Sequence, residues 1–185
     1  MPNIIKVTKQ DILNCALSIT RKDGISNVNA RSIARELHCS IQPIYYYFKT
    51  MDNLRKEIVI EVRNIYNSYI LESKNDPNYT AFKAVGIAYI RFASLETNLF
   101  KLLFMSSAHN KFGIDANIDD NYDYILSTID APIEDAKRIY LALWITTHGV
   151  ATMIATGFMK LTPEEISELL TSVYKGQVLL AKQNR

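Results

Sequence analysis

Segment 29–49 is the part of this chain that most constrains its fold. Its apolar residues recur every three or four positions on both sides of a short polar break at His38 and Cys39. This is the spacing of two short amphipathic helices joined by a tight turn. The positions predicted to share a core are Ile33, Ala34, Leu37, Ile44 and Phe48. The segment therefore predicts a helix-turn-helix, in which the small Ala34 side chain lets the two helices approach.

Polar residues mark where these helices begin. Asn29 is predicted to cap the first, and Ser40 is predicted to cap the second, over residues 41–48. Pro43 falls in the first turn of the second helix, where the backbone amides have no intrahelical partner to lose.

The burial of Ile44 and Phe48 leaves an unusual exposed face on the second helix. The residues predicted to lie on or beside it are Ile41, Gln42, Pro43, Tyr45, Tyr46 and Tyr47. Three tyrosines without an acid are better suited to the major groove of DNA than to plain solvent. A core role for the tyrosines is the alternative, and the i, i+4 spacing of Ile44 and Phe48 counts against it, because those two already supply the buried stripe.

Individual side chains of this region suit different parts of a DNA duplex. Gln42 has the amide that pairs with an adenine edge, and Ile41 and Pro43 suit thymine methyl groups. Groups suited to phosphate oxygens are the tyrosine hydroxyls, Ser40, Lys49 and Thr50. The charge distribution adds modest support, since the first sixty residues carry nine basic and five acidic side chains, whereas the remainder is slightly acidic.

The rest of the sequence also predicts helices and no convincing strand, so the expected class is all-α. Thr8, with Asp11 three residues later, is predicted to cap a helix that stops at Gly24. Thr50 is predicted to cap another over 51–73, with Leu54, Ile58, Val62, Ile65 and Tyr69 facing inward. Further helices are expected over about 80–96, 98–106, 121–129, 132–158 and 163–182, with a loop at 109–120. Pro132 is predicted at a first helical position, and Thr162 and Glu165 are predicted to cap the last helix.

A cluster of helix-breaking residues at 75–78 suggests a boundary within the chain. We therefore predict a DNA-binding domain at 1–50, a connecting helix at 51–74, and an effector-binding and dimerisation domain at 75–185.

Segment 8–58 resembles the N-terminal region of the tetracycline-repressor-like (TetR) family of bacterial transcriptional regulators. The matching residues are Ile33-Ala34, Ser40, Leu54 and the run Ile44-Tyr-Tyr-Tyr-Phe-Lys49. The resemblance implies an N-terminal three-helix helix-turn-helix domain, linked to a larger helical domain that binds a ligand and dimerises. It also implies that 132–158 and 163–182 pair with their twins in a four-helix bundle. By the same resemblance Tyr45 and Lys49 hold phosphates, while Arg31, Ser32, Gln42, Pro43 and Tyr47 face base edges or backbone.

Two residues depart from the pattern of that family. His38 stands where glycine is usual, and histidine tolerates a left-handed backbone better than most residues. Gln42 stands where a small residue is usual, which predicts a different choice of bases.

An apolar cavity between helices of the second domain is the expected site for an effector. The candidate lining residues are Phe82, Tyr89, Phe92, Phe100, Phe104, Met105, Tyr122, Ile125, Trp144 and His148. The alternative is that these residues are simply part of the hydrophobic core. No charged residue stands out as a counter-ion, so the expected ligand is apolar or aromatic. His148 is expected to be packed or hydrogen-bonded, because no nucleophile or orienting carboxylate accompanies it.

Several classes of function find no support in the sequence. There is no phosphate loop, nucleophile elbow or metal-binding histidine pair, so we expect no enzyme activity, no metal and no cofactor. Two cysteines without a disulfide framework, no signal peptide and no membrane span predict a cytosolic protein. The resemblance implies that this is the bacterial cytosol and that the protein is associated with the nucleoid when bound to DNA.

The sequence thus predicts a transcriptional regulator that reads DNA in a sequence-specific manner. It would act as a repressor that binds a palindromic operator on double-stranded DNA as a homodimer and is released by a small effector. The alternative is an all-helical carrier of small molecules or lipids, or an enzyme, with a docking module at its N-terminus.

Overall fold

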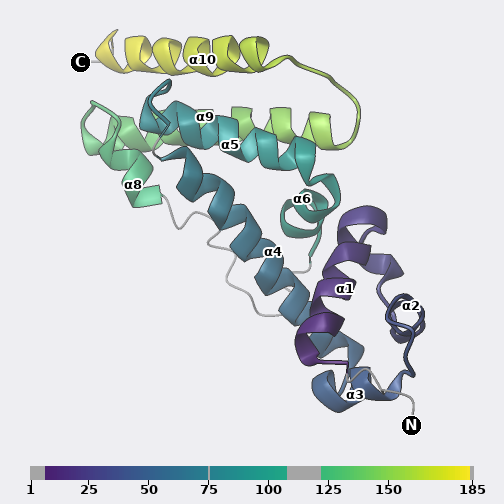
Figure 1. The fold of residues 1–185 in the computed structure, drawn as a ribbon. Coiled ribbons are helices and arrows are strands. Elements are labelled where there is room, and N and C mark those ends of the chain that lie inside the picture. The colour runs from purple at the N-terminus through teal and green to yellow at the C-terminus, as the bar shows by residue number, and fades with distance from the viewer. Residues whose placement is uncertain (1–6, 75, 108–121, 184–185) are drawn as a thin grey trace. The chain divides into compact units, whose positions relative to one another are not determined.

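The computed structural model describes residues 7–74, 76–107 and 122–183, and every regular element in them is a helix (Figure 1). In chain order these are α1 (Lys9–Asp23), the 3-10 helix η1 (Ile25–Asn27), α2 (Ala30–Glu36), α3 (Gln42–Phe48), α4 (Met51–Ser73), α5 (Ala81–Leu95), α6 (Thr97–Phe104), α8 (Tyr122–Ser127), α9 (Ile133–Ala155) and α10 (Pro163–Gln183). The predicted all-α class is confirmed for these residues. The loop predicted at 109–120 lies outside them.

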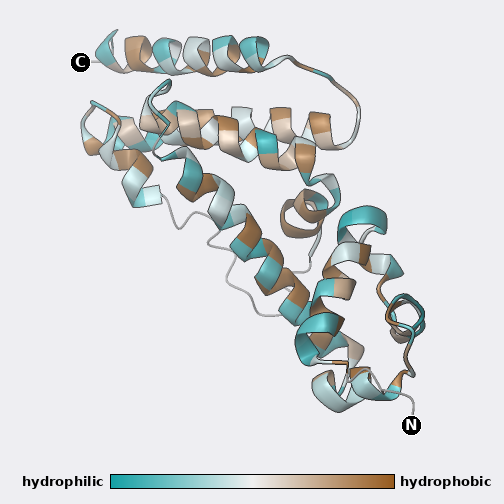
Figure 2. Cartoon of the chain, in the orientation of Figure 1, coloured by the Kyte–Doolittle hydropathy of each residue, from teal (hydrophilic) through white to brown (hydrophobic). Residues whose placement is uncertain are grey.

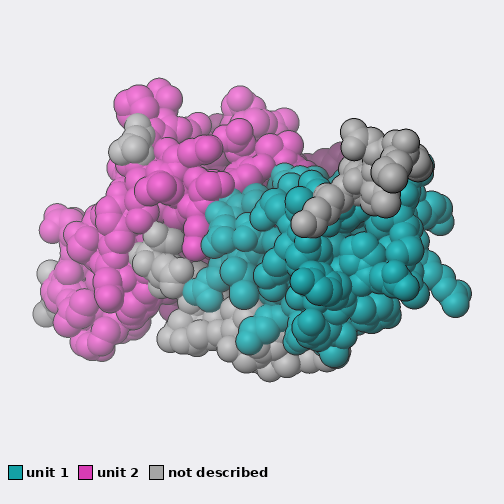
Figure 3. Space-filling view, turned by 60° about the horizontal axis from the view of Figure 1, so that its bottom comes forward, with its two compact units in different colours: residues 1–65, 96–115 teal, residues 66–95, 116–185 magenta. Residues whose placement is uncertain are grey.

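Contacts between helices divide the described residues into two compact units, which Figure 3 colours separately. Unit 1 contains 7–65 and 96–107, and unit 2 contains 66–74, 76–95 and 122–183. Helix α4 contributes to both units. The division by function into 1–50, 51–74 and 75–185 stays a prediction, because the packing of helices does not test it.

In unit 1, α1 begins and ends as the sequence predicts. The Thr8 hydroxyl accepts a hydrogen bond from the backbone N–H of Asp11 (3.1 Å), and the backbone N–H of Thr8 donates to the Asp11 carboxylate (2.9 Å). This capping box satisfies two amides that the helix leaves without partners. At the other end Gly24 has φ +86°, a conformation that glycine adopts without steric cost.

Helix α6 packs against the C-terminal end of α1 within the same unit. Arg21 pairs with Glu96 at 2.7 Å, and the Asn98 side-chain amide donates to the backbone carbonyls of Arg21 and Lys22, each at 3.0 Å. Carbonyls in the last turn of a helix have no intrahelical partner, so Asn98 satisfies two that water would otherwise solvate. The apolar side of α6, coloured brown in Figure 2, is fully or nearly fully buried.

The inward face of α4 differs in part from the prediction. Leu54, Ile58 and Val62 are fully buried, as predicted. Val59 is fully buried as well, and beyond Val62 the buried positions are Tyr66 and Ile70, whereas Ile65 and Tyr69 are only partly buried. The buried face therefore continues through Tyr66 and Ile70 at a spacing of four residues.

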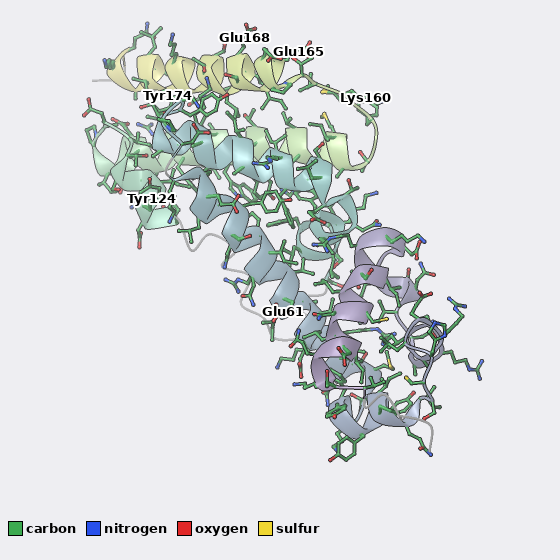
Figure 4. All side chains as sticks on the ribbon, viewed as in Figure 1. Glu61, Tyr124, Lys160, Glu165, Glu168 and Tyr174 are labelled. Atoms are coloured by element: carbon green, nitrogen blue, oxygen red, sulfur yellow. The ribbon has the colours of Figure 1, made fainter. Side chains whose placement is uncertain are left out.

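Unit 2 is built on α5, α9 and α10. Gly86 on α5 allows close packing, since a Cβ there would meet the Cδ1 of Leu170 on α10 at 3.1 Å. Tyr174 lies on the side of α10 that faces α5 (Figure 4), and its ring stacks on Phe82 with centroids 5.7 Å apart. Figure 4 also shows Glu165 and Glu168 extending from α10 away from α5 and α9.

The ends of the two long helices of unit 2 agree with the prediction at one position and differ at another. Thr162 and Glu165 form the predicted capping box, with hydrogen bonds of 2.8 and 3.2 Å. Pro132 occupies the N-cap of α9 instead of the predicted first helical position, because its ψ of 149° is extended and the helix begins at Ile133.

Phe48 is expected to be a major contributor to the stability of unit 1. Only 2% of its surface is exposed, so we expect Phe48→Ala to lower the free energy of unfolding by about 3–5 kcal/mol. Tyr46→Ala on the same helix is the control, because Tyr46 is 70% exposed and should cost about 0.5 kcal/mol or less beyond helix propensity. Urea denaturation followed by circular dichroism measures both, and equal losses would contradict the assigned packing.

Candidate nucleic-acid interface and aromatic cavity

The start of α2 is fixed by a network of side-chain hydrogen bonds. The Asn29 side-chain carbonyl accepts from the backbone N–H groups of Arg31 (3.1 Å) and Ser32 (2.9 Å). The Ser32 hydroxyl accepts from the Asn29 N–H at 3.1 Å and lies 2.9 Å from the Asn27 and Asn29 carbonyls. The predicted cap at Asn29 is confirmed. The hydroxyl of Ser32 is engaged in this cap, whereas the Arg31 side chain is exposed.

The turn between α2 and α3 is tight and contains a left-handed residue. His38 has φ +50°, which is a left-handed backbone conformation. This agrees with the expectation that histidine tolerates that conformation at a position where TetR-like sequences usually have glycine. The Cys39 N–H donates to the Ala34 carbonyl at 3.0 Å. Ile33 and Ala34 are buried as predicted, and Leu37 is only partly buried.

Helix α3 presents two faces of different character. Ile44 and Phe48 are buried, with 1% and 2% exposure. On the other face Tyr46 is 70% exposed, and Ile41 and Tyr45 are each more than 40% exposed. The spacing argument from the sequence is therefore confirmed, because the two apolar residues one turn apart take the core and leave the tyrosines outside it.

The cap predicted at Ser40 is wrong. Helix α3 begins at Gln42, so Ile41 occupies the N-cap position and offers no side-chain hydrogen bond. Pro43 lies in the first turn, as predicted. The backbone N–H groups in the first turn of α3 therefore have neither an intrahelical acceptor nor a side-chain acceptor.

The C-terminal end of α3 places Lys49 at an unusual backbone conformation. Its φ is +64°, its ammonium donates to the Tyr46 carbonyl at 2.9 Å, and it lies 5.4 Å from the centre of the Tyr46 ring. Tyr46 and Tyr47 meet edge to face at 5.0 Å. The Thr50 hydroxyl accepts from the Asn53 N–H at 3.1 Å, so Thr50 caps α4 as predicted.

All the side chains predicted to contact DNA fall on one short stretch of unit 1, at the start of α2, in the turn and on α3. The exposed members are Arg31, Ser40, Ile41, Gln42, Tyr45, Tyr46, Lys49 and Thr50, and the partly buried ones are Ser32, Pro43 and Tyr47. Arg35 is a further exposed cation of this stretch that was not predicted; its side chain is 77% exposed and it lies one turn after Arg31 on α2. The i, i+4 spacing of the two arginines was the signal available for it.

A cavity of about 50 Å³ lies inside unit 2, between α4, α5, α8 and α9. Four of the residues predicted to line an effector site line this cavity, namely Phe82, Tyr89, Ile125 and Trp144. The lining residues that the prediction did not include are Tyr66, Val85, Gly86, Tyr140 and Thr147. Several of these follow predicted ones at helical spacing, as Val85 and Gly86 follow Phe82 and Thr147 follows Trp144, so the helical period was the available signal.

The other predicted lining residues lie elsewhere. Phe92 is fully buried in unit 2, and Phe100 is fully buried in unit 1. Phe104 and Met105 also belong to unit 1, where the Phe104 ring lies 5.1 Å from Phe100. Tyr122 meets Tyr140 edge to face at 4.8 Å, next to the cavity wall.

His148 does not line the cavity but contacts two residues that do, Tyr89 and Trp144. Its Nδ1 lies 2.9 Å from the Tyr89 hydroxyl, and its ring stacks on Trp144 with centroids 5.3 Å apart. The hydrogen-bonded role expected for this histidine is therefore observed. Partial burial lowers the pKa of His148 below its ordinary value, because burial penalises the charged form.

A second hollow, of about 710 Å³, lies between α5, the end of α9 and the start of α10. Arg91 and Lys160 line it together with mostly apolar side chains, and Lys160 is on the connection between α9 and α10 (Figure 4). None of the residues predicted to bind an effector line this hollow.

Solved structures with a similar backbone span nearly the whole chain. A TetR-like transcriptional regulator from Rhodococcus sp. RHA1 aligns with a TM-score of 0.64 and 16% identity, over 97% of this chain and 98% of its own. A second transcriptional regulator from the same organism aligns with a TM-score of 0.67 and 14% identity, over 96% and 97%. The multidrug binding protein EbrR, in complex with ethidium, aligns with a TM-score of 0.62 and 16% identity, over 89% and 96%.

The chain has the fold of the TetR-like transcriptional regulators. The predicted architecture, an N-terminal helix-turn-helix followed by a larger helical part, is confirmed by this likeness. No profile of a known family matches the sequence, and no curated protein matches it. Among the described residues, no helix has the length and apolarity needed to cross a bilayer, and no three His, Cys, Asp or Glu side chains gather as metal ligands would.

The environment of His148 predicts how stability responds to acid. Because its pKa is lowered in the folded protein, the unfolded chain binds a proton at higher pH, and protonation favours unfolding. The stability that neutral His148 contributes is present above its ordinary pKa of about 6.5 and is lost as the pH falls through that value. We expect the free energy of unfolding to fall more between pH 7.5 and 5.5 in the wild type than in His148→Gln. Urea titrations at both pH values measure this, and parallel losses would contradict it.

Proposed function

We propose that this chain is a sequence-specific DNA-binding transcriptional regulator, acting in the bacterial cytosol. The observation that carries the proposal is the division of α3 into a buried stripe, Ile44 and Phe48, and an exposed face of tyrosines. A short exposed helix with aromatic and amide side chains, and no acid, suits the major groove. The likeness in fold to TetR-like regulators supports the same conclusion.

The position of each residue on α3 suggests its role. Ile41, Gln42 and Pro43 lie at the N-terminal end, which is the end that reaches base edges when a recognition helix enters the groove. Gln42 would pair with adenine, and the other two would contact thymine methyl groups. Tyr45, Tyr47 and Lys49 follow along the helix and would hold phosphates.

Hydrogen bonds within the protein indicate which of the other predicted DNA-binding side chains are free to contact DNA directly. The Ser32 hydroxyl completes the capping box of α2 and the Thr50 hydroxyl caps α4, so these residues would serve DNA binding mainly by fixing the backbone at those helix starts. Lys49 donates to the Tyr46 carbonyl and would leave that contact to reach a phosphate. Arg31 and Arg35 lie one turn apart with exposed side chains, and we add Arg35 as a phosphate ligand.

We also propose that the regulator acts as a homodimer joined through α9 and α10. Both helices expose large apolar side chains, including Leu141, Ile145 and Leu180, each more than half exposed. Each also has a glycine, Gly149 and Gly176, at which an added Cβ would meet nothing within 4 Å. Glycine inside a helix costs about 1 kcal/mol relative to alanine, and close approach of a partner helix is a use that offsets this cost.

An acidic side chain at this surface should disrupt the dimer. We expect Ile145→Asp to yield a folded monomer, because a carboxylate buried in an apolar interface loses its hydration without a partner. Leu71→Asp is the matched control, since Leu71 is 64% exposed and belongs to α4, which is not part of the proposed interface. Light scattering coupled to size exclusion measures the mass, and a dimeric Ile145→Asp protein would contradict the proposed interface.

The cavity of unit 2 is the proposed effector site. Its lining is apolar and aromatic, which supports the expectation of an apolar or aromatic effector. EbrR, which shares the fold, binds ethidium in its solved complex. The effector would release DNA by binding more tightly to a dimer conformation whose recognition helices are no longer spaced for successive major grooves, roughly 34–36 Å apart.

A gel shift across salt concentrations tests DNA binding and the role of each side chain. The probe is the DNA upstream of the chain's own coding region. We expect Lys49→Gly to weaken binding to every sequence and to reduce the salt slope by about 2 in a dimer, one phosphate contact per subunit. Glycine is chosen because the backbone of Lys49 has a positive φ, so the helix end should not be strained.

Two further variants separate recognition of bases from the electrostatic attraction of the protein to the DNA phosphates. Gln42→Ala should change the preferred base at one position of each half-site, with a loss of about 1–3 kcal/mol for the original base. Lys182→Ala, at the far end of α10, removes the same charge as Lys49→Gly and should leave the salt slope unchanged. Turnover or stoichiometric ligand uptake without salt-dependent DNA binding would instead support the alternative, a carrier or enzyme with a docking module.

A further inference from the structure

The hollow between α5 and the connection from α9 to α10 is separate from the aromatic cavity. The two have no described lining residue in common, and every described residue that lines the hollow belongs to unit 2. Its volume of about 710 Å³ falls within the roughly 300–1,000 Å³ that is typical of small-molecule sites. The hollow is therefore large enough for a ligand of its own.

The hollow lies beyond the point at which α5 and α10 meet closely. A Cβ added to Gly86 on α5 would lie 3.1 Å from the Cδ1 of Leu170 on α10. The lining residues of α5 follow Gly86, and those of α10 precede Leu170. The two helices run in opposite directions (Figure 1), so both sets lie on the same side of this close contact.

Hydrogen bonds fix the connection that closes the hollow. Gly157, one of the lining residues, has φ +74° and donates its N–H to the Ile154 carbonyl at 3.0 Å. The N–H groups of Phe158 and Met159 donate to the Met153 carbonyl, at 3.0 and 3.2 Å. A wall held in this way is preorganised, so a ligand would not need to order it on binding.

The lining of the hollow is mainly aliphatic. Its aliphatic members are Ile87, Ile90, Leu95, Ile154, Met159, Leu161, Pro163 and Ile166. Among the described lining residues, the one aromatic ring is that of Tyr79. An aromatic ligand would therefore find a single ring to stack on, whereas a hydrocarbon chain gains from any apolar surface that it covers.

Two cations share this lining. Arg91 and Lys160 are both exposed, and neither forms an ion pair with another residue that the structure describes. The Arg91 guanidinium lies 5.6 Å from the centre of the Tyr69 ring. Both positive charges are therefore available to an anion in the hollow.

The acids near the start of α10 lie outside the hollow. Glu164, Glu165 and Glu168 are exposed, and none of them lines it. Figure 4 shows Glu165 and Glu168 extending from α10 away from α5 and α9. In the part of the chain that the structure describes, the lining thus has positive charge and no carboxylate.

We propose that this hollow binds an amphipathic anion, a straight-chain aliphatic carboxylate. Its carboxylate would be held by Arg91, which suits a bidentate contact, and by Lys160, while its chain would cover the aliphatic lining. Because both cations are exposed, the chain would supply most of the affinity and the ion pairs would add a few-fold. The inference goes beyond the proposed function and does not depend on it.

Probes of equal chain length test the role of the head group. Octanoate, octan-1-ol and octylammonium are titrated into the full chain by calorimetry. We expect octanoate to bind about two- to tenfold more tightly than the alcohol, and octylammonium to bind more weakly than either. Hexanoate should bind about tenfold more weakly than octanoate, because two methylene groups fewer are buried. Octylammonium that binds as tightly as octanoate, or an affinity that does not depend on chain length, would overturn the proposal.

Neutral substitutions at the two cations test which charges hold the head group. The double variant Arg91→Gln/Lys160→Gln should lose the preference for octanoate over octan-1-ol and keep its affinity for the alcohol. Lys182→Gln, which removes a charge near the end of α10, is the control and should bind like the wild type. A double variant that retains the full preference would refute the assigned contacts.

A matched pair of acidic substitutions locates the chain of the ligand. Leu95 lines the hollow and is 61% exposed, so Leu95→Asp should fold and weaken octanoate about tenfold through repulsion and lost apolar surface. Leu71→Asp, at a position that is 64% exposed on α4, should have no effect. Equal affinities of the two variants would count against the site. A lower mass of Leu95→Asp than of Leu71→Asp in light scattering would identify the hollow as a contact between copies of the chain, which also contradicts the proposal.

Trp144 distinguishes the hollow from the aromatic cavity. It is the only tryptophan of the sequence and lines the cavity, so its fluorescence should stay unchanged while octanoate fills the hollow. A fluorescence change that follows the calorimetric titration would place octanoate in the cavity and overturn the inference. Both measurements are made without DNA, so failure of the gel shift would overturn the proposed function and leave this site standing.

Discussion

The burial of Ile44 and Phe48 is the interaction on which the exposed face of α3, the proposed DNA-binding surface, depends. Both side chains are almost completely removed from water, and they lie one helical turn apart on α3. Their burial fixes the rotation of α3 about its own axis, and that rotation decides which residues face outward. The exposed tyrosines follow from this choice, because a helix of seven residues has room for one buried stripe and one free face.

The ends of α3 are set by backbone conformation more than by side-chain caps. His38 before the helix and Lys49 after it are the two non-glycine residues with positive φ in the described part of the chain. Between them the N-terminal amides of α3 have no side-chain cap, while the neighbouring helices α2 and α4 are capped by Asn29 and Thr50. In the proposed complex, Gln42 and the first amides at this uncapped start of α3 would be available to DNA.

Unit 2 shows how a core and the wall of a cavity use the same residue types. Phe92 is completely buried. In contrast, Phe82 and Trp144 each line the cavity and also stack on another ring, Tyr174 and His148 respectively. A cavity lined in this way can be filled by a ligand with little rearrangement, and the ligand stabilises whichever conformation keeps the cavity open.

The sequence by itself determined the features that depend on neighbours along the chain. Helical periodicity, the caps at Thr8 and Asn29 and the buried stripe of α3 are local, and each was predicted from spacing and side-chain chemistry. The tertiary structure alone decided features that depend on contacts between distant segments. Phe92 and Phe100 went into the core, while Tyr66 and Tyr140 came to line the cavity. An aromatic side chain on an apolar helix face has the same sequence periodicity whether it packs in the core or lines a cavity. Only the packing of the helices against one another decides which of these two environments it has.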